Sequence, residues 1–340
     1  MAFIRTVLGD VEDSAIGVCY AHEHIIIDPS FTTFTNPDFL LDSVDHACQD
    51  LHDFFLAGGR TLVDSMPCGG GRNAAKLAEI SRRTATNIVC PTGLHLAKYY
   101  PPGHWGDRLN VRELVQLFVA DIEDGIDAWD YNGPTIARTA HRAGVIKIAT
   151  GKTATPREYK ILESAVIAQR QTGAPILTHT EQGDWALEQV QALESLGAQL
   201  KHVAVSHTDR KADPAYHKEI LSTGVFLEYD SAFRWGAESG NPTLDLVVEM
   251  FAAGYGKQIL LGMDAARRKY WKAYGGAPGM DFLLREFVPQ LRARGLSNTD
   301  VNTIFVQNPA RCYSFAFDKP VNLKQGESKL PADQTRNTLT

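Results

Sequence analysis

Two histidines separated by one residue close the first apolar run of the chain. His22 and His24 follow Val18-Cys19-Tyr20-Ala21 and precede three isoleucines. In an extended strand, residues two apart point to the same side, so both imidazoles face one way and Glu23 faces the other. Two imidazoles on one face of an apolar strand can bind the same metal ion. The alternative is two partly buried histidines bonded to backbone groups, and an isolated His-x-His favours this alternative.

Four more polar residues interrupt or end later apolar runs. Lys147 lies within such a run, and His179, His207 and Asp264 each stand at the end of another. Burying so many polar groups is costly unless each has a strong partner, and metal ions supply that partner for imidazole and carboxylate. Singly, the two histidines could bond a backbone carbonyl or lie in a loop, and Asp264 could cap the next segment. Their joint occurrence favours a metal centre.

The lysine needs a separate argument. An ammonium group has three donors and no acceptor, so Lys147 in that form cannot bind a cation. Desolvation beside metal ions favours the neutral amine. A neutral amine can react with carbon dioxide to give a carbamate, whose two anionic oxygens could bridge two divalent ions. The alternative is a lysine that extends toward solvent or pairs with an acid, and Lys147 alone does not exclude it.

The elements that must position these residues follow a regular alternation. Eight short apolar runs alternate with longer amphipathic patterns, and near-continuous apolar runs are typical of parallel strands covered on both faces. We therefore predict an α/β fold, a (β/α)8 TIM barrel with its active site at the C-terminal ends of the strands. The absence of a Gly-x-Gly-x-x-Gly turn after the first strand argues against an open dinucleotide-binding sheet. The predicted strands are Val18–Ile27, Arg60–Met66, Asn87–Gly93, Gly144–Thr150, Pro175–Thr180, His202–His207, Gly224–Tyr229 and Gln258–Met263.

The helical patterns between these runs complete the alternation. A further helix over Asn298–Val306 is expected to cover one end of the barrel. We predict one hydrolase domain over residues 1–316 and a polar tail over 317–340, where the pattern becomes aperiodic. The predicted helices of the barrel are Asp42–Ala57, Asn73–Arg83, Val111–Asp124, Pro156–Thr172, Asp184–Leu196, Pro214–Leu221, Thr243–Tyr255 and Phe282–Arg294.

Composition narrows the class of protein and its partners. The chain has 340 residues, 44% of them hydrophobic, and a net charge of −6. This charge argues against a general nucleic-acid or anionic-membrane binder, although a local basic pocket can still hold a small anion. The start of the sequence has no signal core, and no apolar run approaches the roughly 20 residues that span a bilayer. Five scattered cysteines without a Cys-x-x-Cys fit free thiols in a reducing cytoplasm, where we expect the protein.

The series His22-x-His24, Lys147, His179, His207 and Asp264 resembles the phosphotriesterase branch of the amidohydrolase superfamily. The likeness covers nearly the whole chain, and its specific motifs are Ala21-His22-Glu23-His24, Ala143-Gly144-Val145-Ile146-Lys147, Thr178-His179-Thr180 and Gly262-Met263-Asp264. The resemblance implies two divalent metal ions, one on His22, His24 and Asp264 and the other on His179 and His207, with N6-carboxylysine at Lys147 bridging them. Histidine with carbamate suits zinc first, and also manganese or cobalt.

This arrangement implies a hydrolytic mechanism. Two metals roughly 3.5–4 Å apart can share a hydroxide of lowered pKa, which attacks a carbonyl or phosphoryl centre. Asp264 would be catalytic, taking the proton that the nucleophile releases and passing it toward the leaving group. The mechanism requires no serine or cysteine nucleophile.

Residues beyond the strand ends indicate which substrates the pocket accepts. Arg234 follows the seventh strand, and Arg267 and Tyr270 follow Asp264, so two guanidiniums and a phenol can bind a phosphate or carboxylate. Tyr99, in the connection after the third strand, is the fourth predicted substrate-binding residue. The alternative is a solvated basic loop, which is the better interpretation for the neighbouring residues Arg268, Lys269 and Lys272.

The same positions are similar to those of the family's lactonases for phosphorylated sugars. Arg234 stands where lysine is usual in those lactonases, which keeps the charge but changes its geometry. We therefore predict a lactonase for an anionic, phosphorylated sugar lactone. The alternatives are an N-acyl amino acid or amide hydrolase, a promiscuous phosphotriesterase on the same centre, and a non-catalytic metal-binding barrel. Family members are often homodimers, so a homodimer is expected, with no nucleic-acid or membrane partner.

Overall fold

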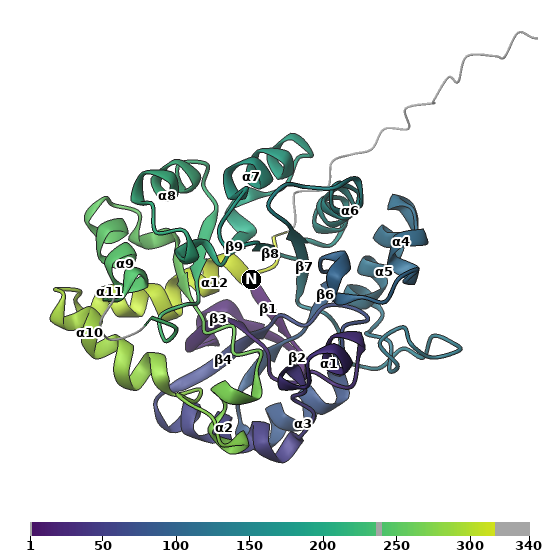
Figure 1. Ribbon diagram of the computed structural model, residues 1–340, viewed down its shortest axis with the longest axis horizontal. Helices are drawn as coiled ribbons and strands as arrows, with labels where there is room; N and C mark the ends of the chain where they lie inside the picture. The colour runs from purple at the N-terminus through teal and green to yellow at the C-terminus, as the bar shows by residue number, and fades with distance from the viewer. Residues whose placement is uncertain (1, 236–239, 317–340) are drawn as a thin grey trace, which may run out of the picture.

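The structure is a computed structural model of the chain and describes residues 2–235 and 240–316. Within these residues, parallel strands form a ring surrounded by helices, as the sequence predicts (Figure 1). β5 and β6 are two halves of one barrel strand, separated at Cys90, so the ring has eight strand positions. The strands are β3 (Val18–Glu23), β4 (Gly59–Asp64), β5 (Asn87–Val89), β6 (Pro91–Gly93), β7 (Val145–Thr150), β8 (Ile176–Thr180), β9 (Val203–Ser206), β10 (Phe226–Tyr229) and β11 (Ile259–Leu261).

The first and last barrel strands meet at the residues that were predicted to bind metal. The backbone N–H groups of Met263 and Asp264 donate to the carbonyl oxygen of His22, over 3.2 and 3.0 Å. Hydrogen bonds along β3-β4-β5 and along β6-β7-β8-β9-β10-β11 connect the other neighbours. The barrel therefore closes at its carboxyl end, beside His22.

The helices of the outer ring lie where the sequence predicts them. α6 shows why: Pro156 occupies its first turn, Thr155 and Glu158 form a capping box, and Gly173 ends it with φ of 73°. One predicted helix differs, because Phe282–Arg294 contains a π-helical turn over Leu283–Phe287 before α10. The helices are α2 (Val44–Leu56), α3 (Ala74–Thr84), α5 (Val111–Glu123), α6 (Pro156–Thr172), α7 (Ala186–Ser195), α8 (Pro214–Leu221), α9 (Pro242–Ala252) and α10 (Val288–Ala293), with short helices α1 (Phe31–Thr35) and α4 (Trp105–Arg108) in the connections.

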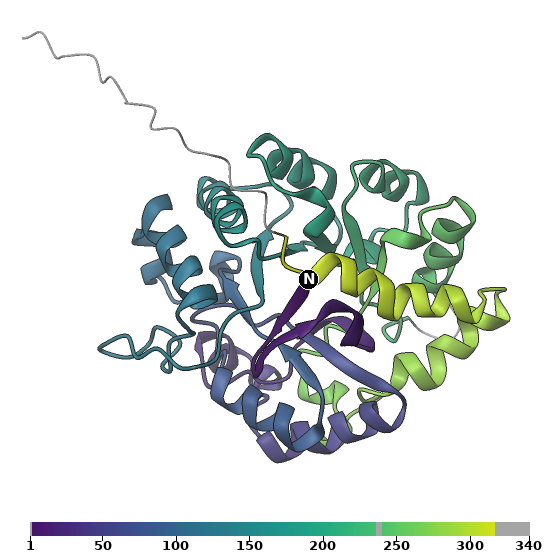
Figure 2. The same ribbon diagram turned by 180° about the vertical axis from the view of Figure 1, so that it is seen from behind.

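The amino-terminal end of the barrel is covered by two segments from opposite ends of the chain (Figure 2). An antiparallel hairpin, β1 (Phe3–Thr6) and β2 (Gly9–Glu12), was not predicted. The predicted helix Asn298–Val306 is longer than expected, since α11 (Asn298–Asn302) continues through a π-helical turn into α12 (Asn308–Tyr313). The Tyr313 hydroxyl donates to the carbonyl oxygen of Ala21 over 2.7 Å, which fixes α12 to β3.

The barrel interior is built in two layers. Near the amino end, each strand contributes a buried apolar residue to a cluster, which Tyr313 of α12 and Ile4 of β1 close from below. Two residues further along several strands, the same inward direction carries polar side chains instead, as on β8, where Leu177 is followed by His179. We call these the apolar layer and the polar layer. The strand residues of the apolar layer are Cys19, Ala21, Val63, Val89, Val145, Leu177, Ala204, Phe226 and Leu260.

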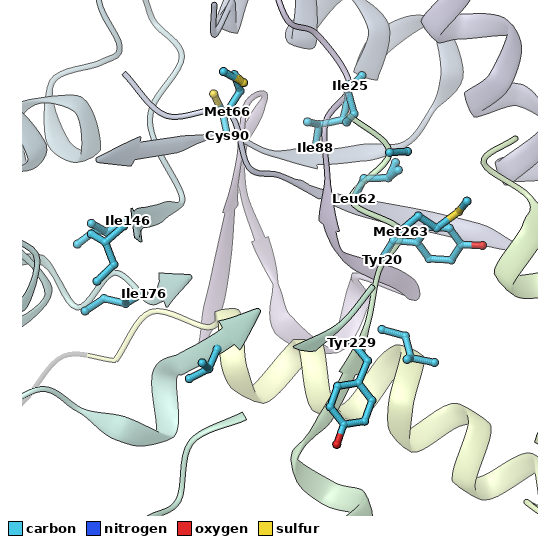
Figure 3. Packing of buried hydrophobic residues seen from close by; sticks show 14 of the residues in the cluster. Tyr20, Ile25, Leu62, Met66, Ile88, Cys90, Ile146, Ile176, Tyr229 and Met263 are labelled. Carbon is cyan, nitrogen blue, oxygen red and sulfur yellow. The ribbon is translucent and has the colours of Figure 1, made fainter. Parts of the chain in front are cut away.

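A second and larger core lies around the apolar layer and includes the contacts between strands and helices. Its residues include Tyr20, Leu62, Ile88, Ile146 and Ile176, all buried (Figure 3). Across the described residues, every helix is too short or too polar to span a lipid bilayer. The polar tail predicted for 317–340 lies outside the described residues.

Candidate metal centre

A pocket of about 170 Å³ opens at the carboxyl ends of the strands. It brings together residues from both ends of the chain and from loops after several different strands. The predicted Lys147 is not in its lining, because that side chain is almost fully buried beneath it. The predicted residues that line the pocket are His22, His24, Tyr99, His179, His207, Arg234, Asp264, Arg267 and Tyr270.

An irregularity in β3 sets the direction of its histidines. Tyr20 pairs with Leu62 and Glu23 with Asp64, so β3 contains one more residue than β4 between these two pairs. Such a bulge turns successive side chains toward the same side. Ala21 therefore belongs to the apolar layer while His22 lines the pocket directly above it.

The ligand atoms of His22, His24 and Asp264 converge. The Nε2 atoms of the two histidines lie 3.8 and 3.3 Å from Oδ1 of Asp264, and one atom from each residue falls within 4.8 Å of the others. Burial, followed by the positive charges of Lys147 and His207, lowers the pKa of His22 well below its usual value. A neutral imidazole is the form that binds a metal ion. These three residues could therefore hold a divalent cation.

Lys147 lies below this group, on β7. Its Nζ is 3.5 Å from Nε2 of His22, and its side chain is only 1% exposed. Burial lowers the pKa of Lys147 to about 8, although nearby carboxylates, Asp264 first, raise it. Among the described residues, no carboxylate lies within ion-pair distance of Nζ. A lysine buried without a direct acidic partner favours neutral amine chemistry over the alternative of a structural ion pair.

His179 and His207 stand side by side, with ring centroids 4.5 Å apart. Burial, and then the charge on His207, lowers the pKa of His179 to about 3, and its buried Nε2 has no hydrogen-bond partner among the described residues. His207 has φ of 66°, a left-handed conformation that breaks the strand alternation and turns the ring into the pocket. An unsatisfied ring nitrogen of a neutral histidine can bind a metal ion.

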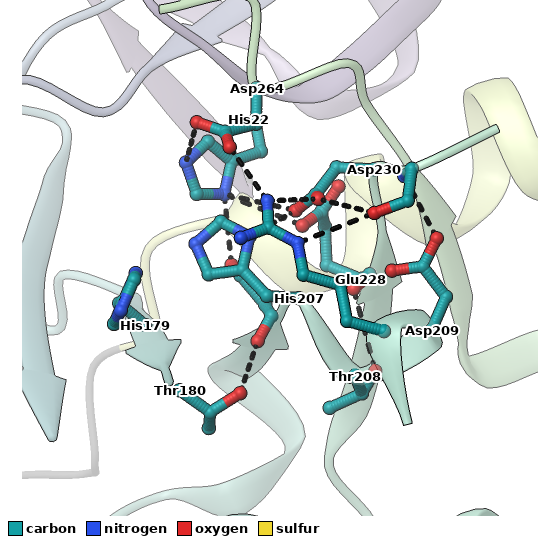
Figure 4. A network of polar contacts seen from close by, with 12 residues as sticks. His22, His179, Thr180, His207, Thr208, Asp209, Glu228, Asp230 and Asp264 are labelled. Carbon is teal, nitrogen blue, oxygen red and sulfur yellow. Dashed lines mark hydrogen bonds and ion pairs between the residues drawn. The ribbon is translucent and has the colours of Figure 1, made fainter. Parts of the chain in front are cut away.

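Two carboxylates of β10 and the residue after it stand behind the histidines (Figure 4). Nδ1 of His207 is 2.5 Å from Asp230, and Nδ1 of His22 is 3.0 Å from the hydroxyl of Ser206 and 3.4 Å from Glu228. Partners at Nδ1 fix the ring orientation and leave Nε2 free for a metal. Both carboxyl oxygens of Glu228 are buried without a hydrogen bond among the described residues, and a Cβ on residue 262 would lie only 2.9 Å from one of them. The same Cβ would lie still closer to the backbone of His22, so Gly262 makes room for both His22 and Glu228.

Asp264 is held between two guanidiniums. Its Oδ2 accepts hydrogen bonds from Arg210 over 2.7 Å and from Arg234 over 3.0 Å. Burial opposes the charged form, but the hydrogen bond to His24 and the positive charges of His207, Arg234 and Arg210 lower the pKa of Asp264 well below its usual value. Asp264 is thus ionised, with Oδ1 directed toward the histidines of β3.

The predicted anion-binding residues form one cationic wall of the pocket. Arg234 donates to the hydroxyl of Tyr270 over 3.0 Å. Arg267 lies over the ring of Phe39 and 3.6 Å from Asp38, a half-buried pair of small energetic weight. The neighbouring Arg268 points away from the pocket and donates to the carbonyl oxygen of Leu40.

Sequence reasoning missed several residues of this site. Arg210 follows His207 by three residues and joins Asp264 to Asp230, which accepts from it over 2.8 Å. His95 packs against His179, with ring centroids 4.7 Å apart. Glu228 and Asp230 carry the same two-residue spacing on their strand as His22 and His24 do on theirs, and that spacing could have revealed them.

Comparisons with known proteins agree with this geometry. A family model described as the phosphotriesterase family matches residues 2–313. A protein named phospho-furanose lactonase from Mycoplasmopsis agalactiae is 34% identical over 94% of this chain and 92% of its own length. The crystal structure of an amidohydrolase from Mycoplasma synoviae superimposes with a TM-score of 0.88, at 32% identity over 94% of this chain and 93% of that one. A lactonase from Listeria monocytogenes gives a TM-score of 0.84, at 30% identity over 92% of this chain and 99% of its own.

Proposed function

The chain belongs to the phosphotriesterase family, and from that premise we propose that it is a metal-dependent lactonase for phosphorylated sugar lactones. Its family and relatives are hydrolases of lactones and phosphotriesters, which supports a metal-dependent lactone or ester hydrolase. The observation that carries the proposal is that one pocket is lined by five of the six candidate metal ligands, all but Lys147, and by a wall of Arg234, Arg267 and Tyr270.

The metal centre would use six residues of this chain. His22, His24 and Asp264 would hold one divalent ion and His179 and His207 the other, with zinc the first candidate. Lys147 would bridge them as a carbamate, formed when its neutral amine adds to carbon dioxide and releases one proton. Two observations support this assignment: Nε2 of His179 has no hydrogen-bond partner among the described residues, and Nζ of Lys147 is buried beside Nε2 of His22 rather than beside a carboxylate. When bound, the metal ions supply an activated water and polarise the lactone carbonyl.

The protein's own groups would orient the substrate and move the proton. Arg234 and Arg267 bind the phosphate, while Tyr270 positions the guanidinium of Arg234 through its hydroxyl. Asp264 accepts the proton that the attacking water loses, and Arg210 keeps this carboxylate charged and fixed between reactions. Tyr99 lines the remaining wall. A neutral phosphotriester offers no anion to the cationic wall, so its hydrolysis would be a side activity.

The test measures kcat/KM for a panel of aldonolactones, each with and without a terminal phosphate, on metal-loaded protein. We expect the wild type to prefer phosphorylated lactones, and Arg267→Ala and Arg234→Ala to lower that preference by roughly tenfold to a hundredfold. Arg268→Ala is the matched control, because it removes a neighbouring arginine that does not line the pocket.

The neutral lactones serve as an internal control, since damage to Asp264 would lower both rates equally. Equal rates on neutral and phosphorylated lactones would discard the phosphate assignment. Hydrolysis of N-acyl amino acids without lactone hydrolysis would favour the amide alternative instead. As further proposals, the partner is a small anion, the enzyme works in the cytoplasm, and it forms a homodimer.

A further inference from the structure

The wall of the pocket opposite the arginines contains a histidine without an assigned role. His95 lies two residues after β6, which belongs to the third barrel strand, whereas Arg234 and Tyr270 lie after the seventh and eighth barrel strands. Its ring lies between Tyr99 and His179, at centroid distances of 4.4 and 4.7 Å and steep interplanar angles of 79° and 61°. It lines the same pocket as the candidate metal ligands.

The two nitrogens of this imidazole have different environments. The backbone N–H of Leu96 donates to Nδ1 of His95 over 2.7 Å, so Nδ1 cannot carry a proton. In a neutral imidazole with Nδ1 as an acceptor, the hydrogen must be on Nε2. Nε2 therefore cannot bind a metal ion in this tautomer, and it is a hydrogen-bond donor for which no partner appears among the described residues.

The backbone of His95 is anchored on both sides. Its N–H donates to the hydroxyl of Tyr100 over 2.9 Å, and its carbonyl oxygen accepts from Arg157 over 2.7 Å. Each anchor is itself fixed, since the Tyr100 hydroxyl donates to the carbonyl oxygen of Cys68 and Arg157 pairs with Asp107. A donor held this firmly is pre-organised to bind an acceptor, because little side-chain freedom is lost on binding.

The chemistry of the acceptor follows from the contrast between the two walls. The arginine wall is charged and suits an anion, whereas a neutral N–H suits an uncharged oxygen. A sugar lactone with its phosphate on the arginine wall and its carbonyl at the metal centre has only ring hydroxyls left for the wall that contains His95. We propose that Nε2–H of His95 donates a hydrogen bond to a ring hydroxyl of the sugar lactone and so determines which sugars the enzyme accepts. This inference rests on the proposed lactonase function.

The experiment compares D-ribono-1,4-lactone 5-phosphate with its 2-deoxy and 3-deoxy analogues on zinc-loaded protein. We expect the wild type to lose roughly tenfold to a hundredfold in kcat/KM on at least one deoxy analogue, because Nε2–H is then left without an acceptor. His95→Phe should act on that analogue and on the parent lactone at similar rates. His95→Gln, which restores an N–H near the same place, should recover part of the discrimination.

The ratio of the two rates separates hydrogen bonding from damage to the metal centre. A loss of metal in His95→Phe would lower both rates and leave their ratio unchanged, and bound zinc per chain is measured alongside. Unchanged discrimination in His95→Phe, or equal wild-type rates on all three compounds, would overturn the inference. Lack of activity on every lactone by zinc-loaded wild type would overturn the lactonase function, and this inference with it.

Discussion

Leu177 and His179 are two residues apart on β8, point the same way, and belong to different regions of the barrel interior. Leu177 packs in the apolar layer among apolar residues of the other strands, and these residues need only close packing, not hydrogen bonds. His179 lies in the polar layer, where a buried ring nitrogen has no partner among the described residues. The same contrast appears on β10 between Phe226 and Glu228. The apolar layer stabilises the barrel, whereas the polar layer contains buried groups, some without a hydrogen-bond partner among the described residues, that could bind a ligand.

The largest expected effect comes from removing a candidate ligand in the polar layer. His179→Asn should lower kcat/KM for the phosphorylated lactones by roughly a thousandfold or more, because metal ions contribute several kcal/mol of transition-state stabilisation. Zinc bound per chain, measured after dialysis with bicarbonate present, should be lower than in the wild type, for which the proposal expects about two ions. Full activity in His179→Asn would remove His179 from the metal centre. A wild type that binds no divalent ion would favour the non-catalytic barrel.

The matched change in the apolar layer should reduce stability and leave activity almost unchanged. Leu177→Ala should lower the free energy of unfolding by about 2–5 kcal/mol, because it leaves a cavity in a closely packed layer. Activity per folded molecule should stay within a few-fold of the wild type, and urea unfolding beside steady-state kinetics measures both. A large loss of kcat/KM with little change in stability would mean that the two layers are not separate in function.

A smaller effect is expected from changing a residue that orients a candidate ligand without itself being one. Asp230→Asn weakens the partner of His207 Nδ1 and one of the two carboxylates bound by Arg210. Zinc affinity or kcat/KM should fall by about 10-fold to 100-fold, which is typical for residues that orient a metal ligand. Glu181→Gln is a useful control, since Glu181 is 3.8 Å from His179 but pairs mainly with Lys98. Equal effects of the two changes would contradict the orienting role of Asp230.

How much the sequence predicts differs between these layers. Apolar runs and amphipathic patterns located the barrel strands and helices, because burial leaves its mark over short stretches of sequence. The two-residue spacing of His22 and His24 predicted their common direction. The bulge that turns His22 to the same side as Ala21 leaves no clear mark in one sequence. Glu228 and Asp230 were overlooked, although their two-residue spacing matches that of His22 and His24.

Residues outside the regular strands were harder to predict. Arg210 and His95 lie in loops, where side-chain direction depends on the backbone turn rather than on alternation, and the left-handed conformation of His207 is of the same kind. The hairpin β1–β2 is short and its β2 residues alternate between half-buried and exposed, so it has no strong apolar pattern. Its position is decided by packing on the barrel end, which only the complete fold provides.

The contact between the first and last barrel strands, β3 and β11, has a consequence for the synthesis of the protein. The backbone bonds from Met263 and Asp264 to His22 join the first barrel strand to the last, and the same residues supply candidate ligands from both strands. Synthesis of the first 264 of the 340 residues must therefore precede both barrel closure and assembly of the candidate ligands, because contacts this distant in sequence form only after the intervening segments exist. A polypeptide terminated before residue 264 has neither a closed barrel nor a complete set of ligands, so an unfinished product cannot act as a hydrolase through this centre.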